Sequence, residues 1–146
     1  RSSLSNQARY TVFELVDMAC SGELVRAIRI LKGLQREGIE PVVIVWSIAR
    51  EIRTMARIAG EISAGGSPSD VYRQNGVWRS RETIVSSAIR RLGTDGCYNL
   101  LRRVGDLDQL VKGQRQGDVW LELEWLIVAL NGLALDEAQV SGGAGE

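Results

Sequence analysis

The sequence predicts an all-α fold, a single bundle of six or seven helices, and two observations carry this prediction. From Thr11 to about Asn131, apolar residues recur at spacings of three and four, and the alternation typical of strands is almost missing. Glycines, prolines and capping residues divide this stretch into segments of helical length. Because 146 residues suit one domain with a sizeable core, we expect the helices to pack antiparallel in one bundle.

Start and stop signals set the bounds of these helices. Thr11 and Glu14 form a T-x-x-E capping box, so residues 1–10 are interpreted as an N-terminal linker. Pro41 suits the first turn of a helix. Residues 133–146 turn acidic and then Gly-rich, and are expected to be a disordered tail. The helical domain is expected over 11–132, with helices at about 11–21, 23–37, 41–63, 68–74, 79–92, 95–112 and 119–131.

Two of these helices have informative faces. The third carries Arg50, Arg53, Arg57 and Glu61 along one stripe, and the three arginines are interpreted as a solvated or subunit-facing surface. The last contains an unbroken apolar run over 125–130, which indicates a helix covered on most sides. The opposite stripe of the third helix is expected to face the core and consists of Val45, Ile48, Ala49, Ile52, Met55, Ala56 and Ala59.

Composition and charge exclude several classes of protein. Eighteen basic and eighteen acidic side chains cancel, so the whole molecule is not an electrostatic nucleic-acid binder, although a local basic patch remains open. Cys20 and Cys97 are too few and too far apart for a disulfide scaffold or a zinc site, and Cys20 is expected to be a core residue. The longest apolar runs are too short to span a membrane, and residues 1–9 do not resemble a signal peptide, so we expect a cytoplasmic protein.

No catalytic, metal or cofactor site is predicted. The chain has no histidine, which excludes Ser-His and Cys-His nucleophilic systems, and no G-x-x-x-x-G-K-[ST] phosphate loop. The acidic pairs Asp106/Asp108 and Glu122/Glu124 are two residues apart, so their members point to different sides of a helix. We expect no enzymatic activity in this segment. Its first residue is not a methionine, so we expect it to be one domain of a longer protein.

Trp78 lies at a turn-to-helix junction among Arg73, Arg79 and Arg81. Arginines and a helix N-terminus can bind phosphates, and an indole can stack on a base. The alternative, favoured by spacing alone, is a tryptophan packed as a hydrophobic staple beside solvated arginines.

A second basic segment is the loop 112–117, which contains Lys112, Gln114 and Arg115. This loop could bind phosphates, but most loops between helices are polar without binding anything, and the residues alone favour that interpretation.

Short motifs along the chain, from about Ala8 to Gly132, occur in a recognisable order. They are Ala8-Arg9-Tyr10 with Phe13 and Val16-Asp17; Gly22 with Arg26-Ala27; Leu31 with Leu34, Glu37-Gly38 and Pro41; Arg50-Glu51; Val77-Trp78 with Arg81; Asp106-Leu107 with Lys112-Gly113; and Trp120 with Leu123-Glu124. Together they resemble the C-terminal helical collar domain of the delta subunit of the bacterial DNA polymerase III clamp loader.

The resemblance implies a non-catalytic role in assembly. Delta subunits of this family have three domains and an AAA+-like module that does not hydrolyse ATP. The collar binds the equivalent domains of the gamma/tau and delta-prime subunits, while an N-terminal region, absent from this chain, opens the sliding clamp. The resemblance thus implies a replisome protein that takes no cofactor and helps to place the clamp on primed DNA.

The resemblance also bears on the candidate residues. It implies that Trp78 and the loop 112–117 face primed DNA inside the ring. With the resemblance included, DNA contact and packing as a staple are equally favoured for Trp78. Relatives carry an aromatic residue at the position of Arg115, and an arginine replaces it here. For this chain the hypothesis is therefore that Arg115 contacts a phosphate, in place of stacking on a base. It also strengthens the subunit-facing interpretation of the third helix. The competing hypothesis is a standalone helical nucleic-acid-binding or adaptor domain unrelated to replication.

Overall fold

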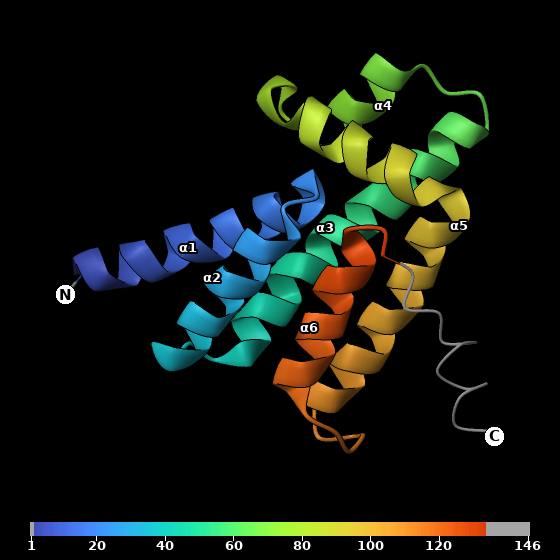
Figure 1. The fold of residues 1–146 in the computed structure, drawn as a ribbon. Coiled ribbons are helices and arrows are strands. Elements are labelled where there is room, and N and C mark those ends of the chain that lie inside the picture. The colour runs from blue at the N-terminus through green and yellow to red at the C-terminus, as the bar shows by residue number, and fades with distance from the viewer. Residues whose placement is uncertain (1, 134–146) are drawn as a thin grey trace.

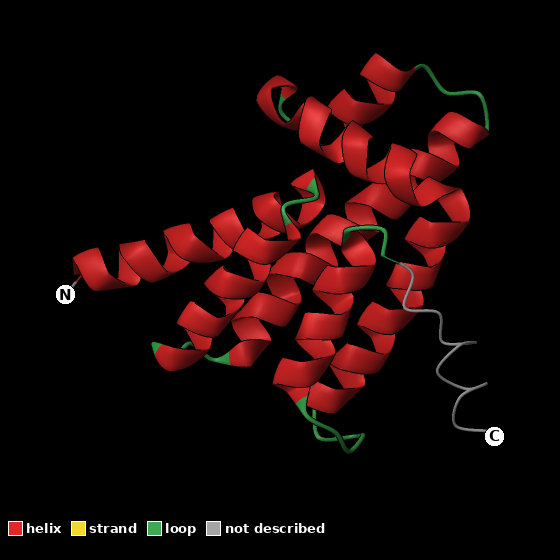
Figure 2. Cartoon of the chain, viewed as in Figure 1, coloured by secondary structure: helices red, strands yellow, loops and turns green. Residues whose placement is uncertain are grey.

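The computed structural model describes the backbone of residues 2–133 and the side chains of residues 12–133. Within that range every regular element is a helix, which confirms the all-α prediction (Figure 1, Figure 2). The elements are α1 (Ser2–Ser21), α2 (Leu24–Arg36), α3 (Pro41–Ser63), α4 (Pro68–Gln74), α5 (Arg79–Val111) and α6 (Val119–Leu130).

α5 is bent at Gly93. There the backbone takes φ 73° and ψ 171°, outside the helical region, and a positive φ is easily adopted only by glycine. The two arms of α5 on either side of Gly93 run in clearly different directions (Figure 1). The sequence predicted separate helices at 79–92 and 95–112, and these correspond to the two arms.

The N-terminal bound of α1 differs from the prediction. α1 begins at Ser2, so Thr11 lies inside the helix and its assignment as a capping residue is wrong. Residues 2–10, which we interpreted as a linker, contain no glycine or proline, so nothing in their backbone chemistry stops the helix. Residues 134–146, predicted to be a disordered tail, lie outside the described residues.

α3 is the central element of the core. It packs against α1, α4, α5 and α6, and in Figure 1 it runs through the middle of the bundle. The predicted inward stripe is confirmed, because all seven of its residues are buried. Each large aliphatic side chain buried here contributes about 1.5–3 kcal/mol, so this stripe provides much of the stability of the bundle.

α6 is less enclosed than its composition suggested. Leu123, Leu126 and Ile127 are buried against the bundle. Leu121 and Trp125, however, remain 44% and 40% exposed, so the expectation of a helix covered on most sides is wrong on this face. An apolar run indicates that a helix packs against other elements, but it does not indicate how many helices cover it.

Arg91, on the first arm of α5, joins the C-terminal ends of α1 and α6. Its Nη2 donates hydrogen bonds to the backbone oxygens of Cys20 and Leu130, both at 2.9 Å. Helix C-termini carry unpaired carbonyls and a partial negative charge. The one guanidinium group therefore supplies a charged hydrogen-bond donor to a carbonyl at the end of α1 and to another at the end of α6. Gly132 leaves room for this side chain, because a Cβ at position 132 would lie 2.9 Å from Arg91 Cγ.

Both cysteines are fully buried, which confirms the core assignment of Cys20. Burial raises the pKa of each thiol above its ordinary value of 9.0, and that of Cys97 to about 11. The folded state therefore favours the protonated thiols. Their stabilising contribution is complete below about pH 9, and for Cys97 it is lost as the pH rises toward 11.

We therefore expect the free energy of unfolding to fall more steeply between pH 9 and 11 in the parent chain than in Cys97→Ala. The difference in slope should approach, at most, about 1.4 kcal/mol per pH unit. Urea unfolding at several alkaline pH values measures it. Equal slopes would show that the thiol is not held protonated by the fold.

Candidate functional site

Trp78 stands at the start of α5 as its N-cap residue, with extended backbone (φ −63°, ψ 149°). The preceding turn passes through Gly76 at φ 75°, and Val77 is buried, so the chain is anchored immediately before the indole. Trp78 itself is 78% exposed. The packed-staple interpretation is therefore wrong, and the ring is free to contact a partner.

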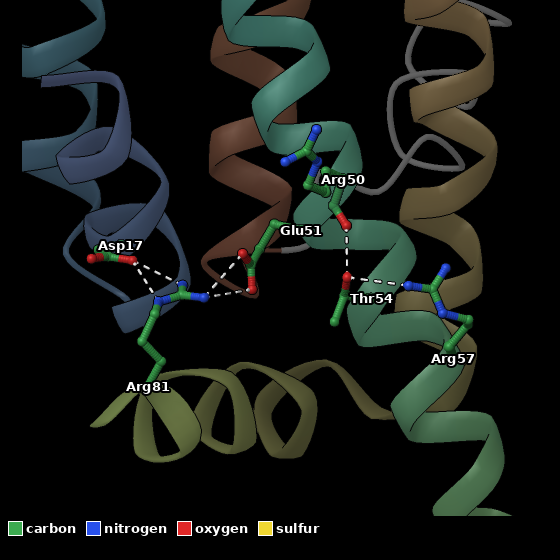
Figure 3. Close-up of polar contacts among 6 residues, drawn as sticks. All are labelled: Asp17, Arg50, Glu51, Thr54, Arg57 and Arg81. Carbon is green, nitrogen blue, oxygen red and sulfur yellow. Dashed lines mark hydrogen bonds and ion pairs between the residues drawn. The ribbon is translucent and has the colours of Figure 1, made fainter. Parts of the chain in front are cut away.

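The three arginines around Trp78 have different surroundings. Arg79 is exposed beside the indole. Arg73 is also exposed, and its Nη2 forms an ion pair with Asp70 Oδ1 at 2.8 Å. Arg81 is partly buried and takes part in an ion-pair cluster that joins three helices (Figure 3).

In that cluster, Arg81 Nη2 donates to Asp17 Oδ1 of α1 at 2.8 Å, and Nη1 donates to Glu51 Oε1 of α3 at 3.2 Å. Burial alone would lower the pKa of Arg81, but the two carboxylates outweigh it and raise the pKa, so the guanidinium group is charged. Because its donors are used within the chain, we do not retain Arg81 as a DNA-contact candidate. It fixes the first turn of α5, which carries Trp78.

The loop 112–117 carries its charges in local pairs. Lys112 Nζ lies 2.8 Å from Asp108 Oδ2, and Arg115 Nη1 lies 2.8 Å from Asp106 Oδ1. Gln114 is exposed. Asp118 closes the loop by accepting hydrogen bonds from the first turn of α6, at Trp120 N and Leu121 N. A phosphate contact by Arg115 would therefore have to compete with Asp106.

Arg115 also borders a hollow of about 230 Å³ between the second arm of α5, the loop and α6. Its walls mix both charges with apolar side chains, so the hollow has no single electrostatic preference. The residues around it are Arg103, Asp106, Leu107, Leu110, Arg115, Gln116, Gly117, Glu122 and Leu126.

The Trp78 turn and the loop 112–117 lie at opposite ends of α5 (Figure 1). The arms on either side of Gly93 rise about 1.5 Å per residue, so each is about 20–27 Å long. The two segments that the sequence proposed as DNA contacts therefore do not form one compact site. Each has to be tested separately.

The arginine stripe of α3 is exposed as predicted. Arg50 and Arg53 point to solvent, while Arg57 is held at two points. Arg57 Nε donates to Asn75 Oδ1 at 3.1 Å, and its Nη2 lies 3.4 Å from Thr54 Oγ1. Thr54 in turn donates to the backbone oxygen of Arg50, so these side chains follow one another along the helix (Figure 3).

The sequence reasoning overlooked the apolar end of this stripe. Trp46 is 59% exposed and Val43 is 43% exposed, on the same side of α3 as the arginines. The helical spacing from Arg50 back to Trp46 and Val43 was a signal that could have identified them. It was masked because both lie in the apolar run that begins at Pro41.

Comparison with known proteins identifies the family. A sequence model of the C-terminal domain of the processivity clamp loader gamma complex of DNA polymerase III matches residues 12–137. The chain belongs to this family. The match spans α1 from Val12 through α6, so it covers nearly the whole helical bundle.

Two curated relatives agree with this clamp-loader family. The chain is 26% identical over 137 residues to DNA polymerase III subunit delta of Haemophilus influenzae, which covers 88% of this chain. It is likewise 26% identical over 140 residues to DNA polymerase III subunit delta of Escherichia coli K12, covering 96% of this chain. In both cases the match covers 40% of the relative's length.

Two absences within residues 2–133 are relevant to function. No group of three or more His, Cys, Asp or Glu side chains in that range is arranged to hold a metal ion. No helix in the same range is long and apolar enough to cross a membrane.

Proposed function

We propose that this chain is the collar domain of a delta-type clamp-loader subunit. In this role it is non-catalytic and holds its subunit in a ring with the gamma/tau and delta-prime subunits. The assembled ring places the sliding clamp on primed DNA at the replisome, in the cytoplasm. The observation that carries the proposal is the family match over 12–137. The sliding clamp itself would be bound by the part of the relatives that this chain does not span.

The surface of the bundle supports a role in assembly. Several large apolar side chains remain 40% or more exposed on α1, α2, α3 and α6. Neighbouring subunits in a ring would bury side chains that are exposed in this way. These residues are Phe13, Val25, Val43, Trp46, Leu121 and Trp125.

The proposal predicts that the chain joins the collar domains of gamma/tau and delta-prime into one complex. Mixed at micromolar concentration, the three should elute together from a sizing column, ahead of any single component. Elution of this chain as a separate monomer in that mixture would contradict the proposal.

Primed DNA is the second proposed partner, and the exposed indole of Trp78 favours it. Trp78→Ala should weaken binding of primed DNA by the reconstituted loader about 5- to 100-fold, because stacking on one base contributes about 1–3 kcal/mol. Fluorescence anisotropy at fixed low salt measures this affinity.

Leu133→Ala is the control for Trp78→Ala, since Leu133 is an exposed apolar residue outside the set that the ring would bury. Its DNA affinity should be unchanged. Arg115→Ala, tested alone, should lower the affinity by a smaller factor, because Asp106 already neutralises this arginine. If Trp78→Ala binds primed DNA as tightly as the parent, the indole is not a DNA contact.

A further inference from the structure

One face of α3 is exposed in the described structure, although Arg57 at its C-terminal end hydrogen-bonds to Asn75. It consists of Val43, Trp46, Arg50, Arg53 and Arg57, and we call it the α3 face. These residues recur at spacings of three and four, so they form one stripe about 21 Å long. The stripe is apolar in its N-terminal half and basic in its C-terminal half.

A groove continues the α3 face sideways onto the second arm of α5. It measures about 320 Å³ and is lined by Arg53, Ala56, Arg57, Tyr98 and Leu101. Its lining combines the apolar side chains of Ala56 and Leu101 with two arginines. It can therefore accept an apolar side chain next to a negative charge.

Tyr98 forms one wall of this groove through a close approach to α3. A Cβ at position 60 would lie only 2.5 Å from the Tyr98 hydroxyl oxygen, so the glycine at this point makes room for the ring. The ring is nevertheless 45% exposed. The groove is thus built by a specific contact between α3 and α5, and its aromatic wall still faces outward.

Two of the three charges on the α3 face, those of Arg50 and Arg53, are not paired within the described residues, whereas Arg57 donates to Asn75 and Thr54. Among residues 12–133, the ion pairs leave the guanidinium groups of Arg50 and Arg53 without a carboxylate. Like charges three or four residues apart on a helix repel each other, and Arg53 has such a neighbour on both sides. An acidic partner would relieve this repulsion, and an apolar one would bury Trp46.

We propose that the α3 face and the adjoining groove dock an acidic amphipathic helix of a neighbouring subunit. This inference rests on the proposed function. Carboxylates of the docked helix pair with Arg50 and Arg53, one of its apolar side chains enters the groove beside Tyr98, and others cover Val43 and Trp46.

Protein rather than nucleic acid is the occupant that this chemistry favours. Val43 and Leu101 are aliphatic side chains, which gain from packing against another apolar side chain. They neither neutralise phosphates nor stack on bases, so they would gain no favourable contact from a bound nucleic acid. A helix that carries acidic and apolar residues at spacings of three and four along one side matches both parts of the face.

The test measures how tightly the intact chain binds purified gamma/tau and delta-prime, using a fluorescent label on this chain. Arg50→Glu with Arg53→Glu, and separately Trp46→Ala, should each weaken binding at least tenfold. Arg26→Glu with Arg29→Glu is the matched control, because these two exposed arginines have the same spacing on α2. The control should bind within twofold of the parent, and thermal unfolding should confirm that all variants are folded.

Each alternative result has a distinct meaning. If the parent chain binds the partners and the α3-face variants bind equally well, the docking proposal is overturned while the proposed function stands. If the parent chain binds neither partner, the proposed function and the docking proposal both fail. If the variants bind primed DNA more weakly but the partner subunits normally, the α3 face binds nucleic acid and the docking of a helix is refuted.

Discussion

Replacing Arg91 with alanine is expected to lower the free energy of unfolding by about 2–4 kcal/mol, the largest effect we expect from a single polar residue. The substitution removes both hydrogen bonds at the C-terminal ends of α1 and α6. It also leaves two backbone carbonyls without their charged donor in a partly buried position. For a chain of this length, the midpoint of thermal unfolding should fall by about 5–15 °C.

Arg90→Ala is the matched control, because Arg90 precedes Arg91 in the same helix and is exposed. It should change stability by less than about 0.5 kcal/mol. Arg91→Lys should recover only part of the loss, since one ammonium group cannot reproduce the geometry of the guanidinium. Equal melting temperatures for Arg90→Ala and Arg91→Ala would mean that the link between α1 and α6 contributes little.

Arg81→Met is expected to destabilise the chain by about 1–3 kcal/mol, the second largest effect. It leaves the carboxylates of Asp17 and Glu51 without the cation that they share. Both acids are partly exposed, at 38% and 14% of their side chains, which keeps the effect below that of a fully buried pair. Arg79→Met, an exposed change in the same helical turn, should be nearly neutral.

A double-mutant cycle separates the ion pairs from general packing. Glu51→Gln in the Arg81→Met background should be less harmful than Glu51→Gln alone, with a coupling of about 1 kcal/mol. Because Arg81 fixes the turn that presents Trp78, Arg81→Met should also weaken binding of primed DNA by the loader if the indole contacts DNA. A coupling of zero would show that Arg81 acts only through its aliphatic stem.

The fold was largely predictable because local signals and burial agree. Pro41 and the glycine-containing stretch after Ser63 define α3, and the period of its apolar residues indicated the buried side. The start of α1 was missed because a T-x-x-E pattern can also occur inside a helix. The exposure of Trp125 was missed because it depends on which neighbours α6 has, which its own sequence does not encode.

The environment of the candidate site was less predictable, because it depends on contacts between distant residues. Asp17 and Glu51 are 64 and 30 residues away from Arg81, so no local pattern indicated that this arginine takes part in an ion-pair cluster. The exposure of Trp78 likewise depends on what packs around the turn at 75–77. Arg91 was overlooked because its partners are backbone oxygens, which leave no trace in the side-chain pattern.

Native mass spectrometry of the mixed collar domains tests the central claim most directly. This chain would be combined with the collar domains of gamma/tau and delta-prime in excess, and the mass of the assembled species determined. A delta-type collar domain should appear as one copy per complex, together with both partners. Complexes of gamma/tau and delta-prime that form without this chain, while it remains monomeric or associates only with itself, would contradict the account.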